Sequence, residues 1–384
     1  MDASDIEYQE RERNGVEEDG LAVELAVLSV IAARLRKVDG STTYAIARAW
    51  QAEDMGAIAE LLSAGAQMLT GRSNRVMDGM GESSDEWARP FFEARGIAQA
   101  SVFEDESMGA ALKSGKAANA RNVASMCRTS VLSLVAPDGT VRRVDEAYRA
   151  ILDSAIRSIM QGDAAYTKAI ERAVRQLSRG GLRVMYPSGS TRELYAAVSM
   201  NVMDGFRLTM QDIRDRQAQR FRADGVEVSA HGMCAEDHLP YQGRQYTRAE
   251  FERIQRGLRR PIGKGMNCRH MVTGVVLGVS PDAYTEERRR AMARESRRKT
   301  GVKTAGGHDM TAYEFSQWQR RSETGIRKLK AQARLHERAG LDPGELEREA
   351  DARRREYVEL SRKAGVETRL ERTRVYEWKL GGRR

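Results

Sequence analysis

Two short groups of soft metal ligands lie within 40 positions of each other in this 384-residue chain. His231 and Cys234 are three positions apart, and Cys268 and His270 are two apart. Two such pairs, brought together from loops, are the usual way to build a four-ligand structural zinc site. We therefore predict structural zinc on His231, Cys234, Cys268 and His270. The spacing is not that of a standard zinc finger, and His238 is a fifth candidate, so the ligand set stays open.

The same residues admit two other interpretations. In one, they only hydrogen-bond the backbone of a loop-rich segment. In the other, residues 231–270 form an enzyme site, with Cys234 or Cys268 as a nucleophile beside a histidine base or with a metal that processes DNA. No orienting third group is evident, and Glu236 and Asp237 are the only carboxylates in the immediate loop. We therefore expect no enzymatic activity.

Basic clusters near the C-terminus are the second feature that could bind a ligand. Residues 281–384 hold 27 Lys and Arg against 18 Asp and Glu, which is the whole net charge of +9. This asymmetry suggests a polyanion near that end, although helices with charge-paired faces would give the same count. No base-reading motif is present, so we expect nonspecific contacts with the phosphates of double-stranded DNA. The predicted contact residues are Arg288, Arg289, Arg290, Arg297, Arg298, Lys299, Arg327, Lys328 and Lys330.

Helical patterns dominate the N-terminal part of the chain. Charged residues make up 31% and hydrophobic residues 41%, with only seven prolines, a composition typical of helices with long solvated faces. Apolar residues at helical spacing predict a helix over 16–38, and Ser41–Thr43 could cap a second one. Residues 71–90 are rich in Gly, Ser and Asp and predict a break. Helical character returns over 91–131.

Short strands interrupt the helices in the centre of the chain. Two apolar runs around a tight turn predict a hairpin over 131–144, and further strands are expected at 182–186 and 226–229. One helix is predicted over 146–178, ending at a Gly-Gly pair, and another over 191–223. We expect the strands to meet in one small sheet.

The C-terminal part is predicted to be helical to its end, with breaks at 301–308 and 340–344. Helices over 311–339 and 345–364 are long enough to pair as an antiparallel hairpin. The predicted fold class is therefore mainly α with a small α+β centre. The length allows two or three domains. We place them at 1–129 (helical), 130–282 (α+β, with a loop-rich segment) and 283–384 (basic and helical).

Cysteine usage and hydropathy indicate the compartment. The three cysteines imply no disulfide framework, so we expect a reducing compartment. The first 20 residues are acidic and polar, unlike a signal peptide. The longest apolar stretch, Leu21–Ala33, is too short and too polar to span a bilayer. We expect a soluble protein made in the cytoplasm, with no membrane partner.

Several segments, in order, resemble the phage minor capsid protein 2 family. The resemblance covers roughly residues 145–384, and residues 231–270 are similar, more distantly, to Mu-type head morphogenesis proteins. Many relatives carry Gly-Ala-Arg-Pro where this chain has Gly232–Ala235, so Cys234 is not a family-wide ligand. The resembling segments are Tyr186–Arg192, Ala196–Val202, Val226–His231, His238–Tyr246, Asn267–His270, Thr311–Glu314, Gln319–Glu323, Ile326–Lys330, Tyr357 and Arg369–Arg374.

The resemblance implies a low-copy virion component, made in the host bacterium and placed inside the head near the portal. It implies the portal protein as a partner, with the major capsid protein as a second one, and roles in head assembly and in DNA packaging or retention. We therefore predict a portal-associated, DNA-proximal structural protein. The alternatives are a metal-dependent DNA-processing enzyme using residues 231–270, or a nonspecific DNA-binding protein.

Overall fold

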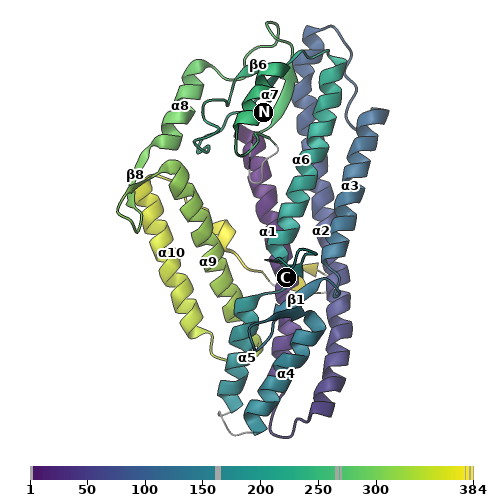
Figure 1. Cartoon of the computed structure of the whole chain (residues 1–384), viewed down its shortest axis with the longest axis vertical. Helices are drawn as coiled ribbons and strands as arrows, with labels where there is room; N and C mark the ends of the chain where they lie inside the picture. Colours follow the sequence, from purple (N-terminus) through teal and green to yellow (C-terminus); the bar gives the residue numbers. More distant parts are fainter. Residues whose placement is uncertain are drawn as a thin grey trace.

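The computed structural model describes residues 3–160, 166–263, 268, 270–376, 378–379 and 382–383. Within these residues the molecule is elongated, and α2 runs along much of its long axis (Figure 1). Helices form most of the structure and the strands form small sheets, so the predicted fold class, mainly α with some α+β character, is confirmed.

Four long helices form the body: α1 (Ala3–Leu35), α2 (Tyr44–Ala94), α3 (Glu106–Met126) and α6 (Leu194–Arg220). α1 packs against α2 and α6, and α3 packs against the same two helices (Figure 1). At 1.5 Å per residue, α2 is about 75 Å long. Thr43 caps it by accepting the backbone N–H of Ile46 at 3.3 Å, as the sequence predicted.

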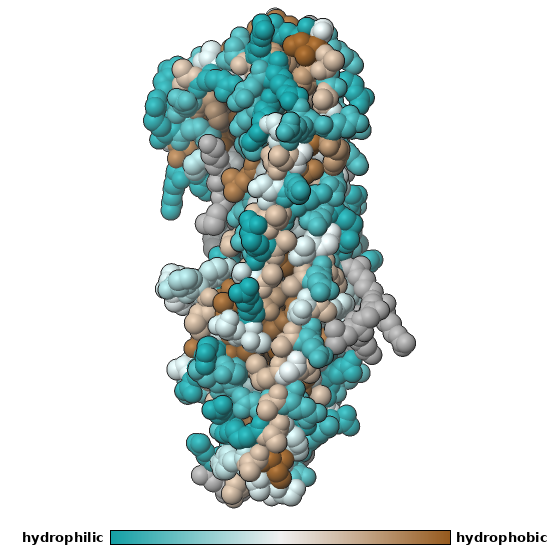
Figure 2. Space-filling view, turned by 90° about the vertical axis from the view of Figure 1, so that its right-hand side faces the viewer, coloured by the Kyte–Doolittle hydropathy of each residue, from teal (hydrophilic) through white to brown (hydrophobic). Residues whose placement is uncertain are grey.

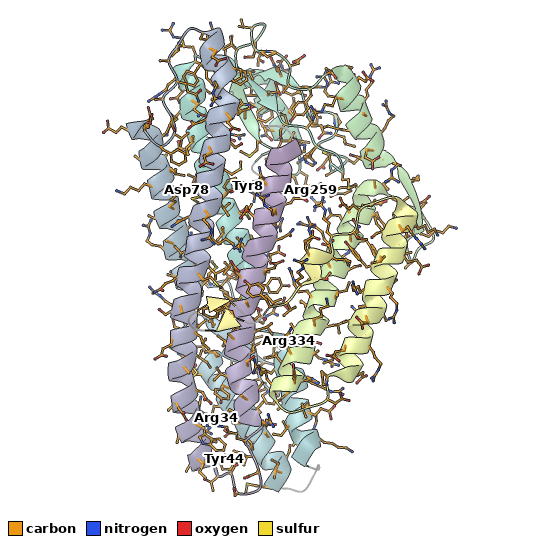
Figure 3. All side chains as sticks on the ribbon, turned by 180° about the vertical axis from the view of Figure 1, so that it is seen from behind. Tyr8, Arg34, Tyr44, Asp78, Arg259 and Arg334 are labelled. Atoms are coloured by element: carbon orange, nitrogen blue, oxygen red, sulfur yellow. The ribbon has the colours of Figure 1, made fainter. Side chains whose placement is uncertain are left out.

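The predicted break over residues 71–90 is wrong, because α2 continues through them without interruption. Their small and polar residues instead make contacts with neighbouring helices. A Cβ added at Gly79 would lie 2.3 Å from the Tyr8 hydroxyl of α1, whose position beside α2 is seen in Figure 3. The buried Ser84 hydroxyl donates to Gln217 Oε1 of α6 at 2.9 Å. Tertiary packing thus overrides a local composition that favours a loop.

A four-stranded antiparallel sheet with the order β2-β1-β3-β4 lies beside the lower half of the bundle (Figure 1). The predicted hairpin and the strand after it are confirmed. The single helix predicted over 146–178 is wrong: α4 (Val144–Met160) and α5 (Tyr166–Gly180) pack against each other, which returns the chain to the sheet. Residues 161–165 lie outside the described part. The strands are β1 (Leu132–Val135), β2 (Val141–Arg143), β3 (Arg183–Met185) and β4 (Thr191–Glu193).

A second, three-stranded sheet has the order β6-β5-β7. The strand predicted near 226–229 is present as β5, but it does not join the first sheet as expected. The reason is α6, whose 27 residues carry the chain about 40 Å along the bundle before β5 begins. The elements here are β5 (Gly225–Val228), β6 (Gln245–Thr247), α7 (Arg248–Gly257) and β7 (Val272–Val275).

The C-terminal part contains the predicted helical hairpin, formed by α9 (Ala312–Arg338) and α10 (Gly344–Ala364). It is not wholly helical as expected, because the predicted break at 301–308 is the turn of a β-hairpin. The remaining elements are α8 (Glu286–Arg297), β8 (Lys299–Lys303), β9 (Asp309–Thr311), η1 (Leu370–Thr373), β10 (Trp378–Lys379) and β11 (Gly382–Arg383).

The largest apolar core draws residues from all three ranges that the sequence proposed as domains. Val23 and Ile31 of α1 lie in it with Tyr148 of α4, Leu177 of α5 and Leu335 of α9. α1 is therefore the element around which the rest is packed. The separation into three domains stays a prediction.

The face formed by α2 and α3 is hydrophilic at its flanks, with a narrow apolar band along the long axis (Figure 2). A hollow of about 800 Å³ lies on these helices and is lined largely by small residues, among them Ala59, Ala66, Ala120 and Ala124. Among the described residues, none of the helices combines the length and the apolar character needed to cross a bilayer.

Candidate metal centre

Five buried histidine and cysteine side chains converge from two loops of the second sheet. His231, Cys234 and His238 lie in the loop after β5, and Cys268 and His270 immediately precede β7. Each side chain is at most 9% exposed. The structure therefore brings all four predicted zinc ligands together and adds the fifth candidate. Residues 267 and 269 of the family-like motif lie outside the described part.

A constrained turn places Cys234. Met233, just before it, has a φ of 55°, a region that non-glycine residues rarely adopt. Hydrogen bonds on both sides hold this turn. The backbone N–H of His231 donates to Gln242 Oε1 at 3.1 Å, and that of Cys234 donates to Ser296 Oγ of α8 at 3.1 Å. The loop is thereby fixed to Gln242, which precedes β6, and to α8.

The ligand atoms form two groups of three that share His270. In the first group, Cys268 Sγ lies 3.4 Å from His270 Nδ1 and 3.7 Å from His238 Nδ1. In the second, Cys234 Sγ lies 3.5 Å from His270 Nε2, with His231 completing the group. Ligands of a tetrahedral zinc ion are separated by about 3.5 Å, given zinc–ligand distances of about 2.0–2.3 Å. Both groups therefore have separations that suit zinc.

Hydrogen bonds around His270 favour the first group. Gln242 Oε1 accepts a backbone N–H from His231, which fixes the amide orientation. The same oxygen lies 3.2 Å from His270 Nε2, so that nitrogen carries the proton and donates. The lone pair of Nδ1 then faces Cys268.

His238 is oriented in the same way. Its Nε2 lies 2.8 Å from the carbonyl oxygen of Arg260, which can only accept, so Nδ1 presents its lone pair to Cys268. Carbonyl partners of this kind typically orient metal-binding histidines. The hydrogen bonds therefore orient Cys268, His238 and His270 toward one another, whereas Cys234 lies near Nε2 of His270 and belongs to the other group. The predicted ligand set, with His231 rather than His238, stays a prediction.

The electrostatics of the first group also suit a metal ligand. Burial tends to raise the pKa of the Cys268 thiol, but hydrogen bonds with His238, Gly263 N–H and His270 outweigh it, and the pKa is lowered. The pKa of His238 is raised, chiefly by its hydrogen bond with Cys268. In contrast, burial raises the pKa of Cys127 to about 12, as in an inert structural cysteine.

The two nearby carboxylates are held by arginines. Glu236 bonds Arg297 of α8, with a shortest distance of 2.5 Å, and Asp237 bonds Arg260 at 2.7 Å. Burial tends to raise the pKa of Asp237, but the hydrogen bond with Arg260 and other favourable interactions lower it. These carboxylates are therefore engaged in ion pairs beside the metal centre.

A cavity of about 850 Å³ adjoins the candidate metal centre and lies between the second-sheet loops, α1 and α9. We call it the arginine cavity, because seven arginines and two glutamates line it together with His231, His238, Cys268 and His270. Figure 3 shows Arg259 beside the N-terminal part of α1, on the side facing α9. Sequence reasoning missed this site, since its arginines come from segments far apart in the chain.

The predicted DNA contacts on α8 lie on an exposed helix at the edge of the molecule (Figure 1). Arg290 and Arg297 face outward although each has a glutamate partner. Arg294, which the sequence did not single out, makes neither a hydrogen bond nor an ion pair with the described residues. The other predicted contacts here are Arg288 over the Tyr284 ring, Arg289 with Glu286, Arg298 with Glu295, and Lys299 with the Asp309 carbonyl.

The predicted contacts on α9 each bond to another part of the chain. Arg327 is 3% exposed and contacts Glu17 of α1 at 3.0 Å. Lys328 pairs with Glu193 at 2.6 Å, and Lys330 donates to a backbone carbonyl at 3.2 Å. The structure thus buries Arg327, whereas Arg290 and Arg297 of α8 remain exposed.

Comparisons with known proteins identify the family of the chain. No curated protein and no solved structure matches it. The sequence profile described as Phage minor capsid protein 2 matches residues 21–363, which is most of the chain. The match includes α2 and α3 as well as the segments whose resemblance was evident from the sequence. The chain belongs to the phage minor capsid protein 2 family.

Proposed function

We propose that this chain is a portal-associated, DNA-proximal structural protein of the phage head. The family match over residues 21–363 carries the proposal, because membership gives the chain a structural role in the head and a place in the virion. We add three proposals that go beyond family membership: contact with the portal, contact with packaged DNA, and a role in packaging or retaining the genome. The major capsid protein is the second partner we propose.

The exposed face of α8 supports a contact with DNA. Arg290, Arg294 and Arg297 line one hollow on this helix, and Arg294 has no carboxylate partner among the described residues. Guanidinium groups spaced along a helix neutralise phosphates without reading the bases. We therefore assign nonspecific duplex binding to α8 rather than to the predicted residues of α9, which bond to other parts of the chain.

The face of α2 and α3 supports a contact with another head protein. Figure 2 shows an apolar band along this face, and the hollow on it is lined by small residues that let a partner helix approach closely. Exposed apolar surface with polar flanks often marks a protein interaction site. We place the portal contact on this face.

A photo-crosslinking experiment in assembled heads tests both contacts. A photoreactive residue at position 120 on α3 should capture the portal protein, and one at position 294 on α8 should capture DNA. Position 354 on the exposed side of α10 serves as the matched control and should capture neither in comparable yield. Absence of the chain from purified heads, or equal yields at all three positions, would refute the proposal.

We further propose that the candidate metal centre holds one structural zinc ion on Cys268, His238 and His270. Among the described residues, the buried cluster of the second sheet is small and consists of Val226, Val228, Phe251 and Ile262; small cores are commonly stabilised by a metal. An ion here would fix the loops between α8 and the arginine cavity. The zinc ion would then hold α8 and the arginine cavity in fixed positions relative to each other.

Zinc measurement by plasma mass spectrometry on the purified full chain tests this assignment. We expect about one zinc per chain, as structural sites give, lost in Cys268→Ser and His238→Asn and kept in His231→Asn. The last variant is the matched control, because it removes a histidine of the other group. Loss in His231→Asn with retention in His238→Asn would assign the ion to the other group. Absence of zinc from the wild type would refute the zinc assignment and favour the interpretation in which these residues only form hydrogen bonds.

The alternative of a metal-dependent DNA-processing enzyme has less support, because Glu236 and Asp237 are bound to arginines. It predicts DNA cleavage by the purified chain in the presence of zinc or magnesium. Cleavage that His270→Ala abolishes would favour this alternative over a purely structural role.

A further inference from the structure

The arginine cavity carries a large local excess of positive charge. Seven of the residues that line it are arginines and two, Glu17 and Glu323, are carboxylic acids, so the lining has a net charge of +5 when both are ionised. Asp237 and Glu10, just outside the lining, pair with Arg260 and Arg372, which leaves an excess of +3. Like charges brought together in a recess repel one another, and this arrangement lowers stability unless an anion compensates it. The cavity therefore has the electrostatics of an anion-binding site.

Two of these arginines are not engaged with the rest of the chain. Arg259, in the loop before the metal centre, and Arg321, on α9, are both exposed and form neither hydrogen bonds nor ion pairs with the described residues. They come from different elements and line one cavity. Their guanidinium donors are thus available to a ligand.

Other arginines of the cavity are held in place by acids on its walls. Arg327 contacts Glu17 at 3.0 Å, and Arg372 lies 3.6 Å from Glu323. Burial tends to raise the pKa of Glu17, but Arg327, Arg13 and other arginines outweigh it and lower the pKa, so this acid is ionised and anchors its partners. The cavity thus combines fixed cations on its walls with two unengaged ones.

We infer that the arginine cavity binds a phosphate-bearing anion, either a free oligophosphate or the phosphorylated end of a nucleic acid strand. Arginine suits this chemistry because its planar donors bind phosphate oxygens in pairs. A volume of about 850 Å³ lies in the range of small-molecule sites. It accommodates a nucleotide-sized group, whereas a duplex has to lie on an open surface such as α8. This inference does not depend on the proposed contact with the portal.

Calorimetric titration of the full chain with sodium pyrophosphate tests the inference. We expect saturable binding to the wild type at physiological salt, weakened about tenfold or more in Arg259→Ala/Arg321→Ala, since each lost charge-assisted bond contributes to affinity. The control is Arg256→Ala/Arg354→Ala, which removes the same charge from exposed arginines outside the cavity. The control should bind about as well as the wild type, because distant exposed charges are screened.

Displacement of pyrophosphate by short single-stranded oligonucleotides identifies the source of the phosphate. Displacement by a 5′-phosphorylated strand but not by its 5′-hydroxyl counterpart would indicate a strand end, and displacement by neither would indicate a free oligophosphate. Pyrophosphate should also protect Arg259 and Arg321 of the wild type from modification by phenylglyoxal, which needs no variant. Absence of saturable binding, or equal binding by the cavity variant and the wild type, would overturn the inference.

Discussion

Glu24 of α1 makes folding depend on pH, and we predict that Glu24→Gln removes this dependence. Its side chain is 5% exposed, and Oε1 accepts the backbone N–H of Leu182 at 3.0 Å. Burial raises the pKa of Glu24 to about 8, and the nearby Glu193 carboxylate adds to the effect, while Leu182 N–H and Lys328 oppose it. The carboxyl group is therefore largely protonated in the folded chain at neutral pH.

The sign of the effect follows from proton linkage. The ordinary pKa of a glutamate is 4.5, so between about pH 4.5 and pH 8 the folded state binds a proton that the unfolded state has released. The free energy of unfolding consequently falls as the pH rises through this window. One pKa unit corresponds to about 1.4 kcal/mol, so the whole span amounts to about 5 kcal/mol.

Glutamine at this position cannot ionise, and its carbonyl oxygen can still accept the Leu182 N–H. The stability of Glu24→Gln relative to the wild type should therefore increase by about 1.4 kcal/mol per pH unit across that window. Urea unfolding, monitored by circular dichroism at about pH 5, pH 6.5 and pH 8, measures the free energy of unfolding of both proteins. Glu60→Gln, an exposed position on α2, is the control and should parallel the wild type. Parallel pH profiles for Glu24→Gln and the wild type would refute the reasoning.

Three further predictions concern packing, a buried hydrogen bond and DNA. Gly205→Ala should lower the melting temperature, at a cost of about 1–3 kcal/mol, because the added Cβ would lie 1.8 Å from Asn119 Oδ1 between α6 and α3; an unchanged melting curve would contradict this contact. Tyr357→Phe should reduce the free energy of unfolding in urea by about 1–3 kcal/mol, because Glu323 loses a buried donor at 2.8 Å; equal stability would show that the bond contributes nothing. Arg294→Ala should reduce the slope of the logarithm of DNA affinity against the logarithm of salt by about 0.9, and an unchanged slope would exclude this residue from the DNA contact.

Local sequence signals predicted those elements whose ends are set locally. Thr43 begins α2 by its own hydrogen bond, and the hairpin of α9 and α10 follows from two helical patterns with a short connection. The error over residues 71–90 has a different origin. Gly79 is compatible with a helix there because Tyr8 fills the space beside it, and this partner lies 71 positions earlier in the chain. The composition of residues 71–90 therefore could not predict the contact with Tyr8.

The candidate site shows the same limit. Spacing identified the histidines and cysteines, because ligand-type residues cluster in the sequence. Spacing does not separate His238 from His231 as a candidate ligand. The contacts of His270 with the Gln242 amide and of His238 with the Arg260 carbonyl, which orient these two rings, arise only in the folded chain. Hydrogen-bond orientation of this kind is not encoded in residue spacing.

The charge asymmetry of the chain is partly balanced within the fold. Glu10 of the acidic N-terminal helix contacts Arg372 at 2.9 Å, and Glu17 of the same helix contacts Arg327 at 3.0 Å. Opposite charges from the two ends of the sequence thus meet along α1. The net charge of the C-terminal quarter therefore overstates the charge that is available to an external polyanion.

The positive charge that remains available to an external ligand lies at two places that differ in shape. Arg294 lies on the open face of α8, whereas Arg259 and Arg321 line a recess, and none of the three has a carboxylate partner among the described residues. An open helical face suits the backbone of a duplex, and a recess suits a small or terminal phosphate. If both assignments hold, Arg294→Ala will weaken duplex binding without changing pyrophosphate binding, and the cavity variant will do the reverse. A variant that weakened both equally would mean that only the overall field of the protein matters.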